Sequence, residues 1–143
     1  MAKPEASLLD PARYPFVTET DIRFGDMDVN RHVNNVALAN FVEEGRVRFH
    51  RASGFHSAIT GLGAMAASVA IEFVGQAFYP GTITLHCGAS RIGRTSYELE
   101  LLLRQDERPV VFARSVMVCM NQGKPFAIPD SFRDSAADWM VRS

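Results

Sequence analysis

One long segment of this chain, residues 35–52, has the residue spacing of an amphipathic helix. Its apolar and small residues recur every three or four positions, at Leu38, Phe41, Val42, Gly45, Phe49 and Ala52. Asn34 suits the capping position before such a helix, and Gly54 suits the residue that ends it. A single helix with one apolar face needs a sheet to cover that face. The pattern therefore predicts an α+β fold in which a sheet wraps around a central helix.

The rest of the chain supplies the strands of that sheet, because apolar and polar residues alternate there. One strand-like segment precedes the helix and four follow it, at 16–24, 68–73, 83–89, 96–103 and 110–120. The last segment is apolar on both faces, which is typical of a central strand. Residues 56–66 are small and rich in glycine, so they are predicted to form a loop. The expected sheet has five antiparallel strands.

Length and composition indicate one domain over residues 1–143, with a polar arm at 1–15 and a polar tail at 129–143. The formal net charge of -1 gives no basis for nonspecific nucleic-acid binding. No apolar run is long enough to span a membrane, and the start lacks the apolar centre of a signal peptide, so we expect a cytoplasmic protein. Cys87 and Cys119 are far apart, and no histidine spacing indicates a metal site. We therefore expect no metal and no other cofactor.

The polar run from Asp26 to Asn35 is the densest group of reactive side chains in the sequence. It holds two carboxylates, one imidazole and three carboxamides, and it lies where the strand pattern changes to the helix pattern. The first N–H groups of a helix lack internal partners, and the helix dipole adds partial positive charge there. An oxyanion or a polarised carbonyl can bind at such an end.

This run and the order of elements together resemble the hotdog-fold acyl-CoA thioesterases of the 4-hydroxybenzoyl-CoA thioesterase type. The family pattern is Asp-x-Asp, a few residues, His-Val-Asn-Asn, a helix with an aromatic residue, then Glu-x-x-Arg. It is carried here by Asp26, Asp28, His32, Val33, Asn34, Asn35, Phe41, Glu43 and Arg46. The resemblance extends from about Phe16 to Phe132. Two positions depart from it, since Arg31 replaces a usual glycine and Leu38 replaces a common aromatic residue.

The resemblance implies hydrolysis of an acyl-CoA thioester to a free acid and coenzyme A. Asp28 matches the catalytic carboxylate, and the backbone N–H at Asn35 would contact the thioester carbonyl. Active sites of the family lie between two subunits, which implies a homodimer or a homotetramer. Two questions stay open: whether Asp28 is a nucleophile or a general base, and whether His32 is a general base or fixes the loop through backbone hydrogen bonds.

The substrate-binding residues follow from the position of the helix. We expect the acyl chain to lie along Leu38 and Phe41, because the apolar stripe begins beside the polar run. Arg91 and Arg94 flank a turn and are candidates for contacts with the phosphates of coenzyme A. Glu43 and Glu44 are expected on a solvated helix face, with the alternative that one of them lines the site.

Two other functions fit the same fold. A hydratase or dehydratase acting on acyl thioesters needs a histidine–carboxylate pair beside the carbons next to the carbonyl, which the Asp-x-Asp motif matches less well. A non-catalytic module that binds acyl-CoA is the third alternative. The chain carries no DNA-binding segment beside this domain, which favours the enzyme.

Overall fold

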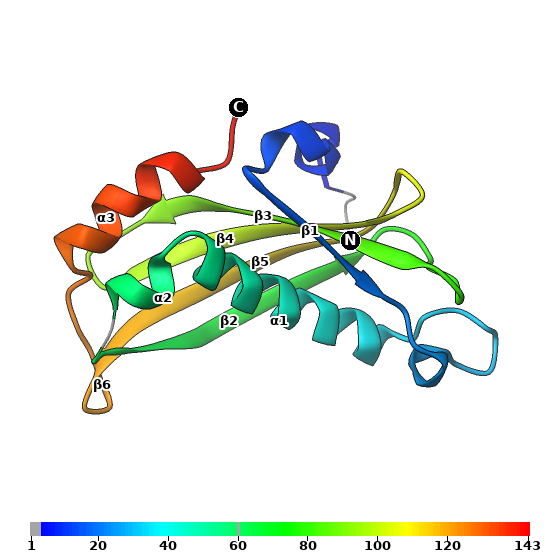
Figure 1. Cartoon of the computed structure of the whole chain (residues 1–143), viewed down its shortest axis with the longest axis horizontal. Coiled ribbons are helices and arrows are strands. Elements are labelled where there is room, and N and C mark those ends of the chain that lie inside the picture. The colour runs from blue at the N-terminus through cyan, green and yellow to red at the C-terminus, as the bar shows by residue number, and fades with distance from the viewer. Residues whose placement is uncertain (1–3, 60) are drawn as a thin grey trace.

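The computed structural model describes residues 4–59 and 61–143 (Figure 1). Its main elements are, in chain order, β1 (Phe16–Asp21), α1 (Asn35–Ala52), α2 (Phe55–Ala58), β2 (Gly63–Phe73), β3 (Thr82–Ile92), β4 (Ser96–Gln105), β5 (Arg108–Asn121), β6 (Lys124–Pro125) and α3 (Asp130–Ala136). The predicted order of one strand, one long helix and four further strands is confirmed.

The sheet is antiparallel, with the strand order β1-β3-β4-β5-β2, and the two-residue strand β6 pairs with β5. It curls around α1, as the ribbon shows (Figure 1). The predicted α+β hotdog architecture is confirmed, with β6 as a short addition to the five strands. As predicted, β5 lies inside the sheet, between β4 and β2. The strands at the two edges are β1 and β2.

The core lies between α1 and the concave side of the sheet. The helix packs mainly against β3 and β4. A Cβ atom added at Gly45 would lie 3.1 Å from Cδ2 of Leu101 and 3.9 Å from Cβ of Leu85. The sheet therefore approaches the helix backbone closely there, which explains a glycine in mid-helix despite its cost of about 1 kcal/mol relative to alanine.

The helix boundaries are those that the sequence predicts. The side chain of Asn34 accepts a hydrogen bond from the backbone N–H of Ala37 at 2.8 Å, as a helix cap does. Gly54 follows the helix with a φ of 81°, in the left-handed region that glycine adopts readily. No helix in the described part of the chain is both long and apolar enough to cross a membrane.

Two local predictions are wrong in part. Residues 56–66 do not form a plain loop: α2 begins at Phe55, and β2 begins at Gly63. Phe55 is fully buried, and its ring lies 4.1 Å from that of Phe132, between centroids, so a distant segment holds this short helix. The first strand ends at Asp21 instead of continuing to Phe24. The Phe24 side chain is 73% exposed, in a 3₁₀ turn that starts the polar run.

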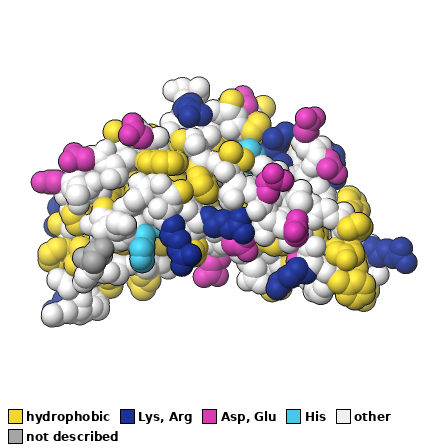
Figure 2. Space-filling view, viewed as in Figure 1, with side chains coloured by type: hydrophobic (Ala, Val, Ile, Leu, Met, Phe, Trp, Pro, Cys, Tyr) yellow, Lys and Arg dark blue, Asp and Glu magenta, His cyan; other side chains and the backbone are white. Residues whose placement is uncertain are grey.

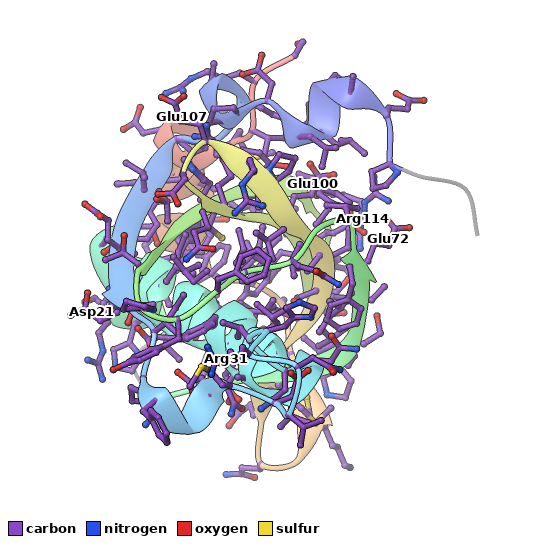
Figure 3. All side chains as sticks on the ribbon, turned by 90° about the vertical axis from the view of Figure 1, so that its right-hand side faces the viewer. Asp21, Arg31, Glu72, Glu100, Glu107 and Arg114 are labelled. Carbon is purple, nitrogen blue, oxygen red and sulfur yellow. The ribbon has the colours of Figure 1, made fainter. Side chains whose placement is uncertain are left out.

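The described part of the N-terminal arm packs on the convex side of the sheet. Nη2 of Arg13 lies 2.8 Å from Oε1 of Glu100, and Nε of Arg114 lies 3.3 Å from the other oxygen of the same carboxylate. Figure 3 shows Glu100 and Arg114 on neighbouring strands. The backbone N–H of Arg142 donates to the carbonyl of Arg13 at 2.7 Å, so the arm and the tail are joined.

Candidate active site

Asp26 holds together the loop that connects β1 to α1. Its Oδ2 accepts a hydrogen bond from the backbone N–H of Arg23 at 2.8 Å, and its Oδ1 lies 3.1 Å from the guanidinium of the same residue. Its carbonyl accepts from the backbone and side-chain nitrogens of Asn34, at 2.9 and 3.0 Å. Asp26 is buried and its groups are occupied. It therefore fixes the loop against the helix start.

Asp28 lies at the exposed tip of the same loop. Its Oδ1 accepts hydrogen bonds from the backbone N–H groups of Asn30, at 2.8 Å, and His32, at 3.2 Å. Within residues 4–59 and 61–143, its Oδ2 has no hydrogen-bond partner. One carboxylate oxygen is thus held by the loop while the other can react with a substrate or a water molecule.

Arg31 has the backbone conformation of a glycine. Its φ is 66°, in the left-handed region that non-glycine residues occupy at a cost of about 1 kcal/mol. Its N–H donates to the carbonyl of Asp28 at 3.1 Å, which closes a tight turn. The departure from the family pattern at this position therefore leaves the turn in place.

His32 contributes mainly through its backbone and its ring packing. Its carbonyl accepts from the N–H of Asp28 at 2.8 Å, and its ring meets the ring of Phe78 edge-on at 5.1 Å between centroids. Neither ring nitrogen bonds to another residue that the structure describes. These contacts favour the loop-fixing alternative over the general-base alternative.

The start of α1 presents two unpaired donors. Asn34 and Ala37 use their N–H groups, but the backbone N–H groups of Asn35 and Val36 have no acceptor in the described chain. Both residues are exposed. The dipole of an 18-residue helix adds partial positive charge at this end. The geometry suits an incoming oxyanion.

The residues predicted to bind substrate lie in different places. Leu38, 2% exposed, and Phe41 pack in the core beneath the sheet. Arg91 and Arg94 lie at the far end of β3. The other end of β3, at Thr82, lies beside the loop that carries Asp28, because the carbonyl of Gly81 accepts from the N–H of Ile22, where this loop begins. At about 3.3 Å per strand residue, Arg91 is roughly 30 Å from Thr82. One chain therefore does not bring the two arginines to its own Asp28. Figure 1 shows that β3 ends at the opposite end of the sheet from the loop between β1 and α1.

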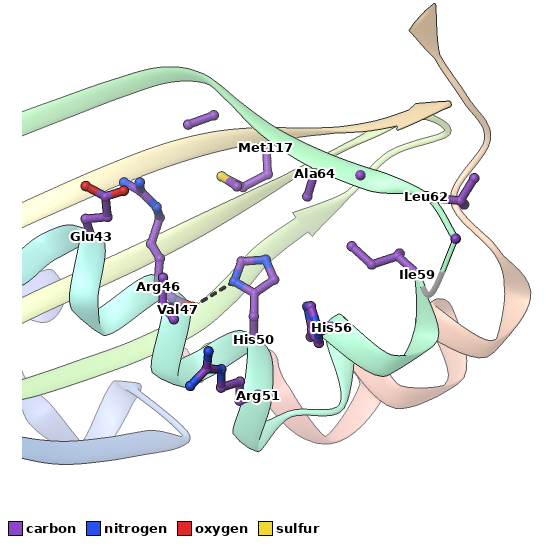
Figure 4. Close-up of a pocket in the computed structure, with 13 residues that line it drawn as sticks. Glu43, Arg46, Val47, His50, Arg51, His56, Ile59, Leu62, Ala64 and Met117 are labelled. Atoms are coloured by element: carbon purple, nitrogen blue, oxygen red, sulfur yellow. Dashed lines mark hydrogen bonds between the residues drawn. The ribbon is translucent and has the colours of Figure 1, made fainter. Parts of the chain in front are cut away.

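A cavity of about 650 Å³ opens beside the second half of α1, between this helix, α2 and the start of β2 (Figure 4). Its walls include Arg46, His50, Ile59, Leu62, Ala66 and Met117. Glu43 also lines it and is exposed, in agreement with the solvated face predicted for this residue. The sequence analysis missed this cavity. The available signal was the spacing of Glu43, Val47 and His50 on one helix face next to the apolar stripe.

His50 is a neutral, fully bonded histidine at the floor of this cavity. Its Nδ1 lies 2.7 Å from the carbonyl of Arg46, and its Nε2 lies 2.6 Å from the hydroxyl of Tyr97. A carbonyl only accepts, so Nδ1 carries the proton and Nε2 accepts from the tyrosine. Burial lowers the pKa of His50, which favours this neutral form. Both ring nitrogens are occupied, so His50 positions the wall and takes no proton from a ligand.

Exposed apolar side chains surround the polar loop. They include Phe24, Val36, Phe78 and Tyr79. The space-filling view shows apolar side chains gathered at the right-hand end, where this loop lies (Figure 2). An exposed apolar patch beside unpaired polar groups marks a surface that meets a ligand or another chain.

Residues 22–135 match the family model of the thioesterase-like superfamily. The chain belongs to this superfamily. Comparison with curated proteins finds no match. Among solved structures, this thioesterase-like protein is similar to a predicted thioesterase from Bacillus stearothermophilus, at 25% identity and a TM-score of 0.81, over 90% of this chain and 98% of that chain.

Two further solved structures share the fold of this thioesterase-like protein at lower identity. One is a thioesterase from Thermus thermophilus in complex with coenzyme A and zinc, at 20% identity and a TM-score of 0.77, over 87% of this chain and 93% of that one. The other is a probable thioesterase from Escherichia coli, at 21% identity and a TM-score of 0.75, over 88% and 98%. Among its own described residues, this protein places no group of three His, Cys, Asp or Glu side chains where they could hold a metal ion.

Proposed function

We propose that this thioesterase-like protein hydrolyses acyl-CoA thioesters to a free acid and coenzyme A, as an enzyme of the 4-hydroxybenzoyl-CoA thioesterase type. The observation that carries the proposal is the junction between the polar loop and α1. There, one exposed oxygen of Asp28 and the unpaired N–H groups of Asn35 and Val36 belong to a single loop closed by Asp26 and Asn34. The thioesterase from Thermus thermophilus in complex with coenzyme A supports this class of substrate.

In the proposed reaction, the carbonyl oxygen of the thioester accepts a hydrogen bond from the N–H of Asn35. The helix start then stabilises the negative charge that develops on this oxygen, a contribution of about 3 kcal/mol for one well-placed donor. The free oxygen of Asp28 either attacks the carbonyl carbon, which forms an anhydride with the acyl group that water then hydrolyses to the free acid and Asp28, or takes a proton from a water molecule that attacks this carbon directly. Coenzyme A leaves as the thiolate and is then protonated. His32 holds Asp28 in place through the backbone.

We also propose that the active unit contains two chains joined along β2. This strand pairs with β5 on one side only, and its residues 63–70 are all exposed. An exposed edge of this length is a template for pairing with another strand. The opposite edge, β1, is partly occupied, because Arg48 donates to the carbonyl of Glu19 at 2.7 Å. Two identical β2 strands paired antiparallel form a two-fold dimer, which can associate further into a tetramer.

This pairing has a consequence for the active site. Along β2 the chain runs from the cavity end, at Gly63, to the loop end, beyond Phe73, where Ala77 accepts from the N–H of Val33 at 2.8 Å. A two-fold axis through the middle of β2 therefore brings the loop of one chain beside the cavity of the other. Arg91 and Arg94 lie toward the cavity end. We retain them as proposed contacts for coenzyme A bound at the Asp28 of a second chain.

Leu38 and Phe41 remain proposed neighbours of the acyl group, as buried residues behind the start of α1. They would meet the carbons nearest the thioester, and the cavity of the second chain would take the rest. Because both side chains already fill the core, their contact with an acyl group requires a change of rotamer.

The experiment that tests the function is a turnover assay with a panel of acyl-CoA thioesters that follows both free thiol and substrate unsaturation. Release of thiol with a free acid supports the thioesterase. A change in unsaturation without thiol release would identify a hydratase or dehydratase. Tight binding without turnover of any substrate would identify a non-catalytic acyl-CoA-binding protein.

A further inference from the structure

The cavity beside α1 combines apolar walls with a positive charge that lacks a partner. Nη1 of Arg46 lies 3.3 Å from the hydroxyl of the fully buried Ser115. Among the described residues this is the only hydrogen bond of its side chain, and none of their carboxylates lies within 4.0 Å of its guanidinium. A half-buried guanidinium has five N–H donors, so most of those of Arg46 are unused.

Arg48, two residues along the same helix, shows the contrast. Its Nη1 donates to the carbonyl of Glu19 at 2.7 Å and to the hydroxyl of Thr18 at 3.0 Å. Its Nη2 lies 2.6 Å from Oε2 of Glu44 and forms an ion pair with it, although the two groups are not aligned for a hydrogen bond. Arg48 is therefore satisfied within the chain and does not line the cavity.

The charges around the cavity favour an anion. Its lining includes two guanidinium groups, those of Arg46 and Arg51, but only one carboxylate, that of Glu43, which is exposed at the helix surface. His50 adds no charge, because its two ring nitrogens are bonded as a neutral imidazole. Ile59, Leu62 and Met117 provide the apolar surface. The volume of about 650 Å³ is in the range of small-molecule sites.

We propose that this cavity binds the distal part of the acyl group, and that Arg46 pairs with a carboxylate at its end. The preferred substrates are then CoA thioesters of dicarboxylic acids. The inference rests on the proposed function and names its substrate class. An acyl chain ending in a methyl group would bury the unpaired guanidinium against an apolar group, which is unfavourable. A terminal carboxylate gives the guanidinium a charge-assisted, bidentate partner while its methylene groups cover the apolar walls.

The test compares suberyl-CoA with octanoyl-CoA, which have equal chain lengths and differ in the terminal carboxylate. We expect the kcat/KM of the unaltered protein to favour suberyl-CoA by about tenfold or more, the effect of one charge-assisted hydrogen bond. Arg46→Met should reduce this ratio at least tenfold, mainly through KM for suberyl-CoA. Arg48→Met is the matched control, and it should leave the ratio intact. If Arg46→Met does not fold, Arg46→Lys replaces it and should lower the ratio to a smaller extent.

Two results would overturn the inference. One is equal kcat/KM for the two substrates in the unaltered protein, and the other is a ratio that neither change of Arg46 affects. In both cases hydrolysis itself would still support the thioesterase. If no thioester is hydrolysed, the proposed function fails, and calorimetry with octanoate and 1-octanol, which differ in the terminal carboxylate, then tests the cavity. Tighter binding of octanoate that is lost in the Arg46 variant supports the inference, and equal binding of the two ligands overturns it.

Discussion

The carboxylate of Asp28 and the backbone of His32 form a closed pair of hydrogen bonds. Oδ1 of Asp28 accepts from the N–H of His32 at 3.2 Å, and the N–H of Asp28 donates to the carbonyl of His32 at 2.8 Å. The loop thereby turns back on itself and holds one oxygen of the carboxylate in place. Among the described residues no second charged side chain bonds to this carboxylate, so the proposed chemistry depends on the carboxylate itself and on the helix start.

Asp28→Asn should abolish hydrolysis while the fold remains. An asparagine keeps the oxygen that the loop N–H groups require but loses the anionic oxygen. Loss of a nucleophile or general base should lower kcat on the order of a hundredfold or more. Initial rates give the activity, and calorimetry with an acyl-CoA should show that binding persists. Near-normal turnover in the folded variant would remove Asp28 from the mechanism.

Asp26→Ala serves as the contrasting substitution in the same motif. Asp26 is 4% exposed, and its carboxylate accepts from the N–H of Arg23. Its removal should lower the free energy of unfolding by about 1 to 2 kcal/mol, the usual cost of losing such a cap. Thermal unfolding measures this loss. A stable Asp26→Ala protein would contradict the structural role of Asp26.

Arg31 offers a test of the turn. At a φ of 66°, glycine relieves the left-handed strain, although it also raises the entropy of the unfolded chain. Arg31→Gly should therefore change the stability by less than about 1 kcal/mol. Arg31→Val places a β-branched residue in the same region and should be at least about 1 kcal/mol less stable than Arg31→Gly. Equal unfolding temperatures for the two variants would contradict the left-handed turn.

The features that the sequence predicts best are those with local causes. The start and end of α1 follow from a capping side chain at Asn34 and from a glycine at position 54. The fold class follows from one helical period among strand periods. A glycine in mid-helix, Gly45, lies where the sheet approaches the helix closely, at Leu101. Each of these signals lies within a few residues of the feature that it specifies.

The features that the sequence does not reveal depend on contacts between distant segments. α2 forms where the sequence predicts a loop, because Phe55 packs against Phe132 at the other end of the chain. The cavity arises where α1, α2 and β2 meet. The spacing of Glu43, Val47 and His50 marks one helix face, but no local pattern reports how far this face lies from β2. The position of Arg91 follows from the full length of β3. The sequence places it beside a turn but does not tell at which end of the molecule that turn lies.

Acid should destabilise this protein through its buried histidines. Burial, followed by the nearby Arg104, lowers the pKa of His86 from its ordinary value of 6.5 to about 4, and its Nε2 is unpaired within the described residues. The unfolded state then binds more protons than the folded state below pH 6.5, so stability falls as the pH drops toward 4. The lowered pKa of His86 should reduce the free energy of unfolding by about 2 kcal/mol at pH 5 relative to pH 8.

The burial of His50 acts in the same direction. The measurement is urea unfolding at pH 8, 6 and 5, for the unaltered protein and for His86→Leu. The variant should lose less stability between pH 8 and pH 5 than the unaltered protein does. Identical losses in both proteins would mean that His86 is not buried as a neutral group.

A charge at the edge of β2 should separate the proposed dimer. Val69 is 42% exposed on this strand, and Val69→Lys places an ammonium group where a second strand would pack. We expect light scattering at micromolar concentration to show a shift from dimer to monomer, with a parallel loss of hydrolysis. Val17→Lys, at a 57% exposed position on the opposite edge, is the control and should stay dimeric. A stable, active monomer of the unaltered protein would contradict the shared site.

Leu38→Tyr tests whether the first carbons of the acyl group pass beside Leu38. This side chain is 2% exposed, and the resemblance to the family associates the same position with an aromatic residue. A tyrosine should narrow the space behind the helix start, at a cost in stability of about 1 to 3 kcal/mol from overpacking. Activity should then fall more for long aliphatic acyl-CoA substrates than for short ones. A buried methylene contributes about 0.8 kcal/mol, so the change in specificity should be a few-fold per carbon.

The measurement is kcat/KM over a series of acyl chain lengths, which gives the change in activity per carbon. Val47→Leu is the comparison, because Val47 lies on the same helix but lines the cavity. Parallel profiles for the unaltered protein and Leu38→Tyr would mean that Leu38 only packs the core, and the cavity beside Arg46 would then carry the specificity for chain length.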